Sequence, residues 1–322
     1  MTQARAKIVI PDDFPPVISN TPALESLKTH GDVDLYTSRP DTQDELIRRI
    51  RGAHTVVNIR AYCKFTTEVL QACPGLKHLA VWGTGTDHVD LAAAKALGML
   101  VTNTPNTATD SVAEQGLALM LAVARKIPFI DAQVKRGEWV RGMLTQLAGK
   151  TLGVLGTGAI GMRMAQLGKG IGMHVIAWTY HPDPVQAAAL GLRYLPTMAE
   201  VLQQADVVSI HLRYSPDTEH IIGANELALM KPTALFVNTA RGQLVDQEAL
   251  YKALHDGQIA GAGLDVFEQE PIDPHDPLLT LPNVVLSPHT AGTTPEALMN
   301  GLDLCAANVE AFLAGRMQNQ VV

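Results

Sequence analysis

Cysteine is scarce in this sequence, and its spacing excludes several kinds of site. The 322 residues include three cysteines, Cys63, Cys73 and Cys305, with no CxxC spacing. An odd number of widely separated cysteines argues against a disulfide framework and favours reduced thiols in the cytoplasm. The histidines lack the spacing of zinc ligands, so we expect no metal ion.

The chain also lacks long apolar runs and an excess of positive charge. No stretch approaches the roughly 20 uninterrupted apolar residues that a membrane-spanning helix needs, and the first residues do not resemble a signal peptide. The formal net charge is −7, so the chain has no excess of positive charge with which to bind nucleic acid or an anionic membrane. We therefore expect a cytoplasmic protein that binds neither nucleic acid nor a membrane.

What the sequence does contain is a repeated alternation of strand-like and helix-like segments. In the first hundred residues, strands are expected at 6–10, 34–37, 55–59, 79–82 and 100–102, and helices at 45–51 and 91–97. A capping box at 111–114 is expected to start a long helix, and the irregular residues 129–148 would suit an arm or an interface. A second series of strands is expected at 152–155, 175–178, 207–212, 234–238, 261–266 and 284–287. This βαβ rhythm predicts mostly parallel sheets.

The two series predict an α/β protein of two Rossmann-like domains with parallel sheets, separated by a cleft. A last amphipathic helix, capped at 293–296, has an apolar face of Leu298, Leu302, Cys305, Val309 and Phe312. We predict that residues 1–105 plus 292–322 form a substrate-binding domain and residues 106–291 an NAD(P)-binding domain. Two chain crossings between domains would leave a cleft, the usual location of a two-substrate reaction.

A glycine loop opens the second series. Gly156, Gly158, Ala159, Ile160 and Gly161 lie in the pattern GTGAIG, after a strand and before a helical run. Glycines at these positions allow a tight turn, a close approach of a pyrophosphate and close packing of helix on strand. The helix N-terminus then stabilises the phosphates, so the loop predicts a dinucleotide site.

The residues at the end of the next strand do not decide whether the cofactor is NAD or its 2′-phosphorylated form, NADP. An acidic residue there normally binds the ribose of NAD, but this chain has Thr179, and Asp183 comes four residues later. Arg213 follows the adjacent strand and is expected near the adenine ribose. The cofactor is therefore NAD(H) or NADP(H). Alternatively, Arg213 only stacks on the adenine or faces water.

Three ionisable residues, Arg241, Glu270 and His289, follow successive strands of the second series. Each alone could be structural, but the carboxyl ends of parallel strands form the ligand crevice of such sheets. An arginine can bind a carboxylate through two parallel bonds, and a histidine can donate a proton near neutral pH. A carboxylate bonded to the far ring nitrogen would stabilise the imidazolium. The trio predicts redox chemistry on a small anionic keto or hydroxy acid.

Four segments, GTGAIG, NTARGQLVD, GLDVFEQEP and SPHTAG, resemble those of the D-isomer-specific 2-hydroxyacid dehydrogenases. The segment VWGTGTDHVD at 81–90 is similar to the N-terminal substrate loop of that family, so the resemblance covers nearly the whole chain. It implies that Arg241 binds the substrate carboxylate, His289 is the acid/base, and Glu270 orients His289. It also implies a homodimer.

The resemblance extends to further contacts. It implies cofactor contacts at Thr84, Thr218, Thr239, Asp265 and Gly292, and substrate contacts at Arg60, Thr84 and Gly85. The chain departs from the phosphoglycerate enzymes at Val81, where they carry a second phosphate-binding arginine.

The expected function is hydride transfer between a nicotinamide cofactor and a small 2-keto or D-2-hydroxy acid. Glyoxylate or hydroxypyruvate is the first substrate expected. One alternative is a non-catalytic NAD(H)-sensing protein like the related co-repressors. The other is a dehydrogenase of a small inorganic or one-carbon anion.

Overall fold

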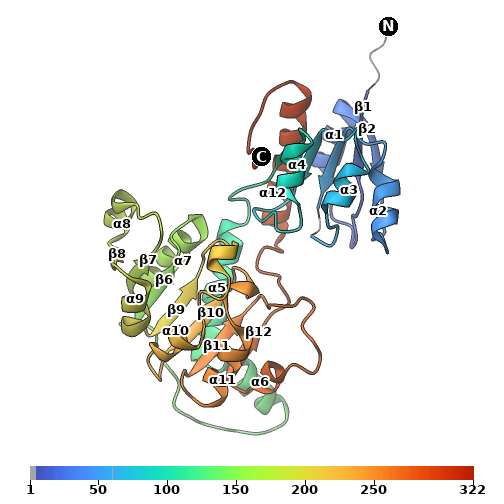
Figure 1. The fold of residues 1–322 in the computed structure, drawn as a ribbon. Coiled ribbons are helices and arrows are strands. Elements are labelled where there is room, and N and C mark those ends of the chain that lie inside the picture. Colours follow the sequence, from blue (N-terminus) through green and yellow to red (C-terminus); the bar gives the residue numbers. More distant parts are fainter. Residues whose placement is uncertain (1–4, 60) are drawn as a thin grey trace. The chain divides into compact units, whose positions relative to one another are not determined.

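The computed structural model describes residues 5–59 and 61–322, which form two compact units. Unit 1 contains the chain up to Ala108 together with Thr294–Val322, and unit 2 contains Thr109–Thr293. In Figure 1 unit 1 carries the blue segments and the last red helix, and unit 2 runs from green to orange. The substrate contact expected at Arg60 lies outside the described residues.

Unit 1 is built on a five-stranded parallel sheet in the order β2-β1-β3-β4-β5. The strands are β1 (Ala6–Ile10), β2 (Gly31–Leu35), β3 (Thr55–Asn58), β4 (His78–Val81) and β5 (Leu100–Thr102). The helices are α1 (Pro22–His30), α2 (Gln43–Ile50), α3 (Thr67–Gln71), α4 (Leu91–Ala96) and α12 (Pro295–Leu313). Val9 and Val56 face one core, while Ile8 and Val57 face the other, so both faces of the sheet are covered.

Helix α12 returns the chain to unit 1 and completes one of its cores. The hydroxyl of Thr294 caps the helix by accepting a bond from the Ala297 amide. Leu302, Cys305 and Val309 are fully buried in the core that also holds α1. The amphipathic face and the cap predicted from the sequence are therefore confirmed.

Unit 2 is built on a seven-stranded parallel sheet in the order β12-β11-β10-β9-β6-β7-β8. The strands are β6 (Thr151–Leu155), β7 (His174–Trp178), β8 (Arg193–Tyr194), β9 (Val207–Ile210), β10 (Leu235–Asn238), β11 (Gly261–Leu264) and β12 (Val284–Leu286). The helices are α5 (Thr109–Ala124), α6 (Ile127–Lys135), α7 (Ala159–Gly170), α8 (Pro184–Leu190), α9 (Met198–Gln204), α10 (Ala224–Ala228) and α11 (Gln247–His255). The prediction of an α/β protein with two parallel sheets is confirmed.

The sheet of unit 2 separates two cores. Helices α5 and α7 contribute to one core, and α9, α10 and α11 contribute to the other. Along β10 the side chains alternate, since Phe236 faces the second core while Leu235 and Val237 face the first. Burial on both faces leaves the strand ends as the place where polar residues can gather.

Some local predictions were wrong. The second strand begins at Gly31 rather than residue 34, because it follows α1 without a loop and only glycine fits there: a Cβ at Gly31 would lie 2.4 Å from the Ala6 carbonyl oxygen. Helix α5 begins at Thr109, so Ser111 lies within its first turn instead of capping it. Helix α1, capped by Thr21, was not predicted.

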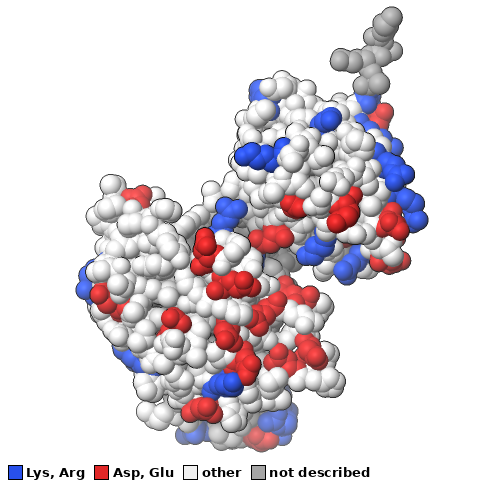
Figure 2. Space-filling model, viewed as in Figure 1, with Lys and Arg blue, Asp and Glu red and all other residues white. Residues whose placement is uncertain are grey.

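Residues 127–144 of unit 2 expose several large apolar side chains. They include Ile127, Phe129, Val134, Val140 and Leu144, together with Trp139 at 78% and Met143 at 96% exposure. On the face drawn in Figure 2, acidic and basic side chains are interspersed, with acidic ones prominent over unit 2. No helix within residues 5–59 and 61–322 is both long and apolar enough to cross a membrane.

Candidate active site

The register of three neighbouring strands brings the ionisable trio to one edge of the sheet. Asn238 at the end of β10 pairs with Leu264 at the end of β11, and Leu264 pairs with Leu286 at the end of β12. The three strands therefore end level, and the segments that follow them carry Arg241, Glu270 and His289.

His289 and Glu270 form a directly bonded pair. The Nδ1 atom of His289 lies 2.7 Å from Oε2 of Glu270, and Oε1 of Glu270 accepts a bond from the Phe267 amide at 3.1 Å. Burial alone would raise the pKa of Glu270, but the hydrogen bond and charge of His289, the Phe267 amide and the charge of Arg241 together lower it. Glu270 is thus an anion over the neutral range, and Nε2 of His289 is left to face a ligand.

Arg241 is held by the turn that follows β10. The Asn238 side chain accepts a bond from the Ala240 amide and donates one to the Arg241 carbonyl, both at 2.9 Å. Gly242 then passes directly over the neighbouring loop, since a Cβ there would lie 1.9 Å from the Phe267 carbonyl carbon. Only glycine permits this crossing, which keeps the loops of Arg241 and Glu270 in contact.

Asp265 positions the loop that carries His289. Its buried carboxylate accepts bonds from the Ser287 hydroxyl at 2.6 Å, the Thr290 amide at 3.0 Å and the Ala291 amide at 2.9 Å. The His289 amide bonds to the Asp265 carbonyl at 2.7 Å, and His289 itself has φ of 54°. A non-glycine residue in this left-handed region persists only where its surroundings hold it, and Asp265 supplies that hold. Sequence reasoning missed this role and that of Asn238.

The glycine loop lies at the same edge, between the ends of β9 and β7. Gly156 has φ of 93°, and a Cβ there would lie 2.8 Å from the His211 backbone, so conformation and packing both require glycine. A Cβ at Gly161 would lie 1.9 Å from the Gly156 carbonyl oxygen. Gly158 differs, because it has an ordinary φ of −66° and a Cβ there would meet nothing within 4 Å.

Neither strain nor the chain's own packing therefore accounts for glycine at 158. An open glycine at the start of the helix is what the close approach of a pyrophosphate to the backbone requires in dinucleotide folds. Helix α7 begins at this point without a side-chain cap, whereas α8, α9 and α11 are capped by Asp183, Thr197 and Asp246. Its free N–H groups and its dipole suit a phosphate, so the loop fits a nicotinamide dinucleotide.

Replacing Gly158 with alanine is expected to weaken dinucleotide binding roughly ten-fold or more, because an extra methyl in a close contact costs about 1–3 kcal/mol. Thermal stability should hardly change, since the new Cβ meets no protein atom. Gly170→Ala is the matched control, because this exposed glycine at the other end of α7 is equally open. Titration calorimetry with NADH and NADPH would measure the difference. Equal affinities for both variants would contradict the interpretation.

The other residues expected to contact the cofactor differ in their surroundings. The Thr218 hydroxyl bonds to the carbonyl of Arg213 at 2.9 Å and accepts a bond from the Ser215 amide, which holds the turn after β9. The Thr239 hydroxyl is buried without a hydrogen-bond partner among the described residues. Gly292 directly follows the loop that Asp265 holds.

Thr84 and Gly85, which are also expected to contact the substrate, lie in unit 1. Gly83 has φ of 111°, and the Thr84 carbonyl accepts a bond from Asn103 at 2.8 Å, which fixes the loop that continues into Gly85. Trp82 packs against α12 so closely that a Cβ at Gly301 would lie 2.0 Å from its Nε1. Trp82 is therefore part of the fold, while Thr84 is exposed.

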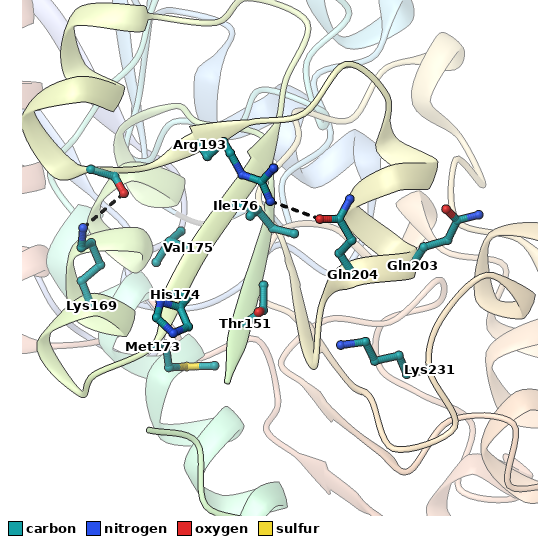
Figure 3. Close-up of a pocket in the computed structure, with 11 residues that line it drawn as sticks. Thr151, Lys169, Met173, His174, Val175, Ile176, Arg193, Gln203, Gln204 and Lys231 are labelled. Atoms are coloured by element: carbon teal, nitrogen blue, oxygen red, sulfur yellow. Dashed lines mark hydrogen bonds between the residues drawn. The ribbon is translucent and has the colours of Figure 1, made fainter. Parts of the chain in front are cut away.

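A hollow of about 670 Å³ lies at the opposite edge of the sheet of unit 2, at the amino ends of β6 and β7 (Figure 3). The basic side chains that line the hollow are bonded to other protein groups. Arg193 bonds to Gln204 at 3.1 Å, Lys169 bonds to the Gly191 carbonyl at 3.2 Å, and Lys231 pairs with Asp206. The hollow is therefore distinct from the edge that holds the trio and the glycine loop.

Comparison with known proteins agrees with this geometry. Residues 117–291 match the model of the D-isomer specific 2-hydroxyacid dehydrogenase NAD-binding domain. A glyoxylate reductase from Korarchaeum cryptofilum is 38% identical over 306 residues, covering 93% of this chain and 92% of that protein. A D-3-phosphoglycerate dehydrogenase from Methanocaldococcus jannaschii is 39% identical over 303 residues, or 93% of this chain, which spans only 57% of that protein.

Solved structures agree over nearly the full length. An acyclic imino acid reductase, Bsp5, in complex with NADPH and D-Arg has a TM-score of 0.89 and 28% identity, covering 98% of this chain and 100% of that one. D-lactate dehydrogenase from Aquifex aeolicus, complexed with NAD and lactic acid, has a TM-score of 0.86 and 30% identity, covering 98% and 99%. These two relatives therefore bind different nicotinamide cofactors.

Proposed function

Because the chain belongs to the D-isomer-specific 2-hydroxyacid dehydrogenase family, we propose that it reduces small 2-keto acids, glyoxylate and hydroxypyruvate first, to D-2-hydroxy acids. The bound nicotinamide supplies the hydride. The observation that carries the proposal is the 2.7 Å pair of His289 and Glu270, in loops that follow strands ending level with the strand before Arg241.

Each member of the trio has a part in this reaction. Arg241 binds the substrate carboxylate through two charge-assisted hydrogen bonds. His289 donates the proton on Nε2 to the carbonyl oxygen as that oxygen gains negative charge. Glu270 keeps Nδ1 of His289 as the bonded nitrogen and stabilises the imidazolium, so the proton is presented from one defined atom.

Further contacts are proposed for the cofactor and for the substrate. Unit 2 binds the dinucleotide through Gly156, Gly158 and Gly161 and the N-terminus of α7. Thr84 and Gly85 are proposed substrate contacts, as the family resemblance implies. A phosphorylated substrate is disfavoured, since Val81, a fully buried residue, stands where the phosphoglycerate enzymes carry a second phosphate-binding arginine.

The direct test is a set of steady-state rates with glyoxylate, hydroxypyruvate and phenylpyruvate, each with NADH and with NADPH. Turnover of at least one keto acid supports the proposal. Tight dinucleotide binding without turnover of any of them would favour a non-catalytic NAD(H) sensor. Turnover of formate or an inorganic anion alone would favour a dehydrogenase of small inorganic or one-carbon anions.

The pH profile gives a sharper test of Glu270. Its lowered pKa keeps the carboxylate ionised above its ordinary value of 4.5, so its charge is constant through the working range. In Glu270→Gln the imidazolium loses its anion, and the alkaline limb of kcat/KM for reduction should move to lower pH. Glu268→Gln is the control, because Glu268 lies in the same loop as Glu270 but is paired with another histidine, His220. The control variant therefore loses the same charge. An alkaline limb that stays in place in Glu270→Gln would contradict the role of Glu270.

We also propose that the chain is a cytoplasmic homodimer that buries residues 127–144. Seven large apolar side chains in this segment are exposed, and such a patch marks an association surface. The three cysteines are all unpaired, as expected in a reducing compartment. Light scattering after size exclusion should give twice the mass of one chain. Trp139→Ser with Met143→Ser should give the single mass, while Met317→Ser, exposed to 72% in unit 1, should not.

A further inference from the structure

The two strand ends that flank the glycine loop form the adenosine end of the proposed dinucleotide site. The Gly156 amide donates to the Trp178 carbonyl at 2.8 Å, and the His211 amide donates to the Leu155 carbonyl at 2.7 Å. Thr179, the residue after Trp178, therefore lies on one side of the glycine loop. Arg213 lies on the other side, two residues after His211. In dinucleotide folds the adenine ribose lies at the end of the second strand, here β7.

The residues that directly follow β7 offer no carboxylate to the ribose hydroxyls. Thr179, half-buried directly after β7, has a neutral side chain, and residues 179–182 contain no acid. The first acid is Asp183, whose Oδ1 accepts bonds from the Val185 and Gln186 amides at 3.0 and 3.1 Å to cap α8. Its backbone is tied as well, since the Asp183 amide donates to the Tyr194 hydroxyl at 3.3 Å.

Arg213 offers a positive charge at the end of β9. Its carbonyl is fixed by the Thr218 hydroxyl, and its side chain is exposed at the end of β9. In the part of the chain that the structure describes, no acidic side chain pairs with its guanidinium. The cations Lys231 and Lys169 elsewhere in unit 2, by contrast, are bonded to Asp206 and Gly191.

We propose that the adenosine end of this site is built for a 2′-phosphorylated cofactor, with Thr179 admitting the phosphate and Arg213 binding it. The inference rests on the proposed function and extends it to the choice of NADPH over NADH. A carboxylate at 179 would accept bonds from the ribose hydroxyls but repel a phosphate dianion, whereas a threonine hydroxyl can donate to it. Strands β7 and β9 flank β6 and so lie about 10 Å apart, a span that a nucleotide fits.

Binding can be tested without turnover. We expect 2′,5′-ADP to bind the wild-type protein roughly ten-fold or more tighter than 5′-ADP, because hydrogen bonds to a charged group are worth about that ratio. Titration calorimetry with these two fragments, and with NADPH and NADH, gives the four dissociation constants. Equal binding of the two fragments, or a preference for NADH, would overturn the proposal.

Two variants, each with a control, test the roles of Thr179 and Arg213 in binding the 2′-phosphate. Thr179→Asp should weaken 2′,5′-ADP binding and reverse the preference toward NADH, while Thr179→Asn, of equal size but uncharged, should keep the preference. Arg213→Ala should weaken 2′,5′-ADP binding roughly ten-fold and 5′-ADP binding far less. Arg193→Ala removes an equal charge at the opposite edge of the sheet and should change neither.

The outcomes separate this proposal from the proposed function. An equal loss of both fragments in Arg213→Ala would mean that Arg213 stacks on adenine, and it would overturn its role with the phosphate. Selective binding of 2′,5′-ADP with no turnover of any keto acid would support this inference and count against the reductase.

Discussion

His289→Ala is expected to lower kcat for keto acid reduction by roughly two to four orders of magnitude, the usual contribution of a general acid. Without the imidazole, the developing alkoxide loses the proton donor that the proposal assigns to it. The KM should change much less, because His289 is assigned to proton transfer and not to carboxylate binding. Stopped-flow measurement of NAD(P)H oxidation under single-turnover conditions would isolate the chemical step.

A second histidine provides the control for this variant. His255 at the end of α11 lies 2.9 Å from Asp256, so it also forms an imidazole and carboxylate pair, but on a helix away from the strand ends. His255→Ala should keep the wild-type kcat. If His289→Ala also kept it with every active keto acid, another group would have to supply the proton and the mechanism would be wrong.

Arg241→Ala is expected to lower kcat/KM roughly a hundred-fold or more, since two charge-assisted hydrogen bonds of about 1.5–3 kcal/mol each are lost. Most of this loss should appear in KM, because the bonds form in the bound state as well as in the transition state. Arg241→Lys should recover only part of it, since an ammonium keeps the charge but not the planar pair of donors. Steady-state kinetics with glyoxylate would measure both variants.

The turn around Arg241 allows these variants to be interpreted. The substitution removes one bond of the turn, from the Arg241 guanidinium to the Ala240 carbonyl at 2.7 Å. Asn238 still holds the turn through the Ala240 amide and the Arg241 carbonyl, and neither of these bonds involves the part of the side chain that is removed. The variants should therefore unfold close to the wild-type temperature. An unchanged KM in a folded Arg241→Ala protein would assign carboxylate binding to other groups.

The sequence predicted the architecture because strand and helix patterns alternate along it. Parallel strands must have their carboxyl ends at one edge, so residues that follow successive strands can be expected together, as Arg241, Glu270 and His289 were. Their roles remain predictions. The strand at Gly31 was misplaced because its start depends on a tight contact with Ala6, and no periodicity reports such a contact.

The supporting residues could not be predicted for a similar reason. Asp265 reads as one more acid in the loop after a buried strand, yet its bonds to Ser287, Thr290 and Ala291 join segments more than twenty residues apart. Gly242 reads as an ordinary turn residue until its contact with Phe267 is seen. Such roles follow from how two loops cross, which depends on the complete fold.

The return of α12 to unit 1 has a consequence for the order in which the chain folds during synthesis. The ribosome completes the five strands of unit 1 before residue 103, but the helix that buries Leu302, Cys305 and Val309 in their core is made only after all of unit 2. The last residues also bond to β5, since the Val101 amide donates to the Val322 carbonyl at 3.1 Å. Domains fold as units once their residues are available. Unit 2 can therefore reach its native state first, while the unit that begins the chain waits for the helix that ends its core.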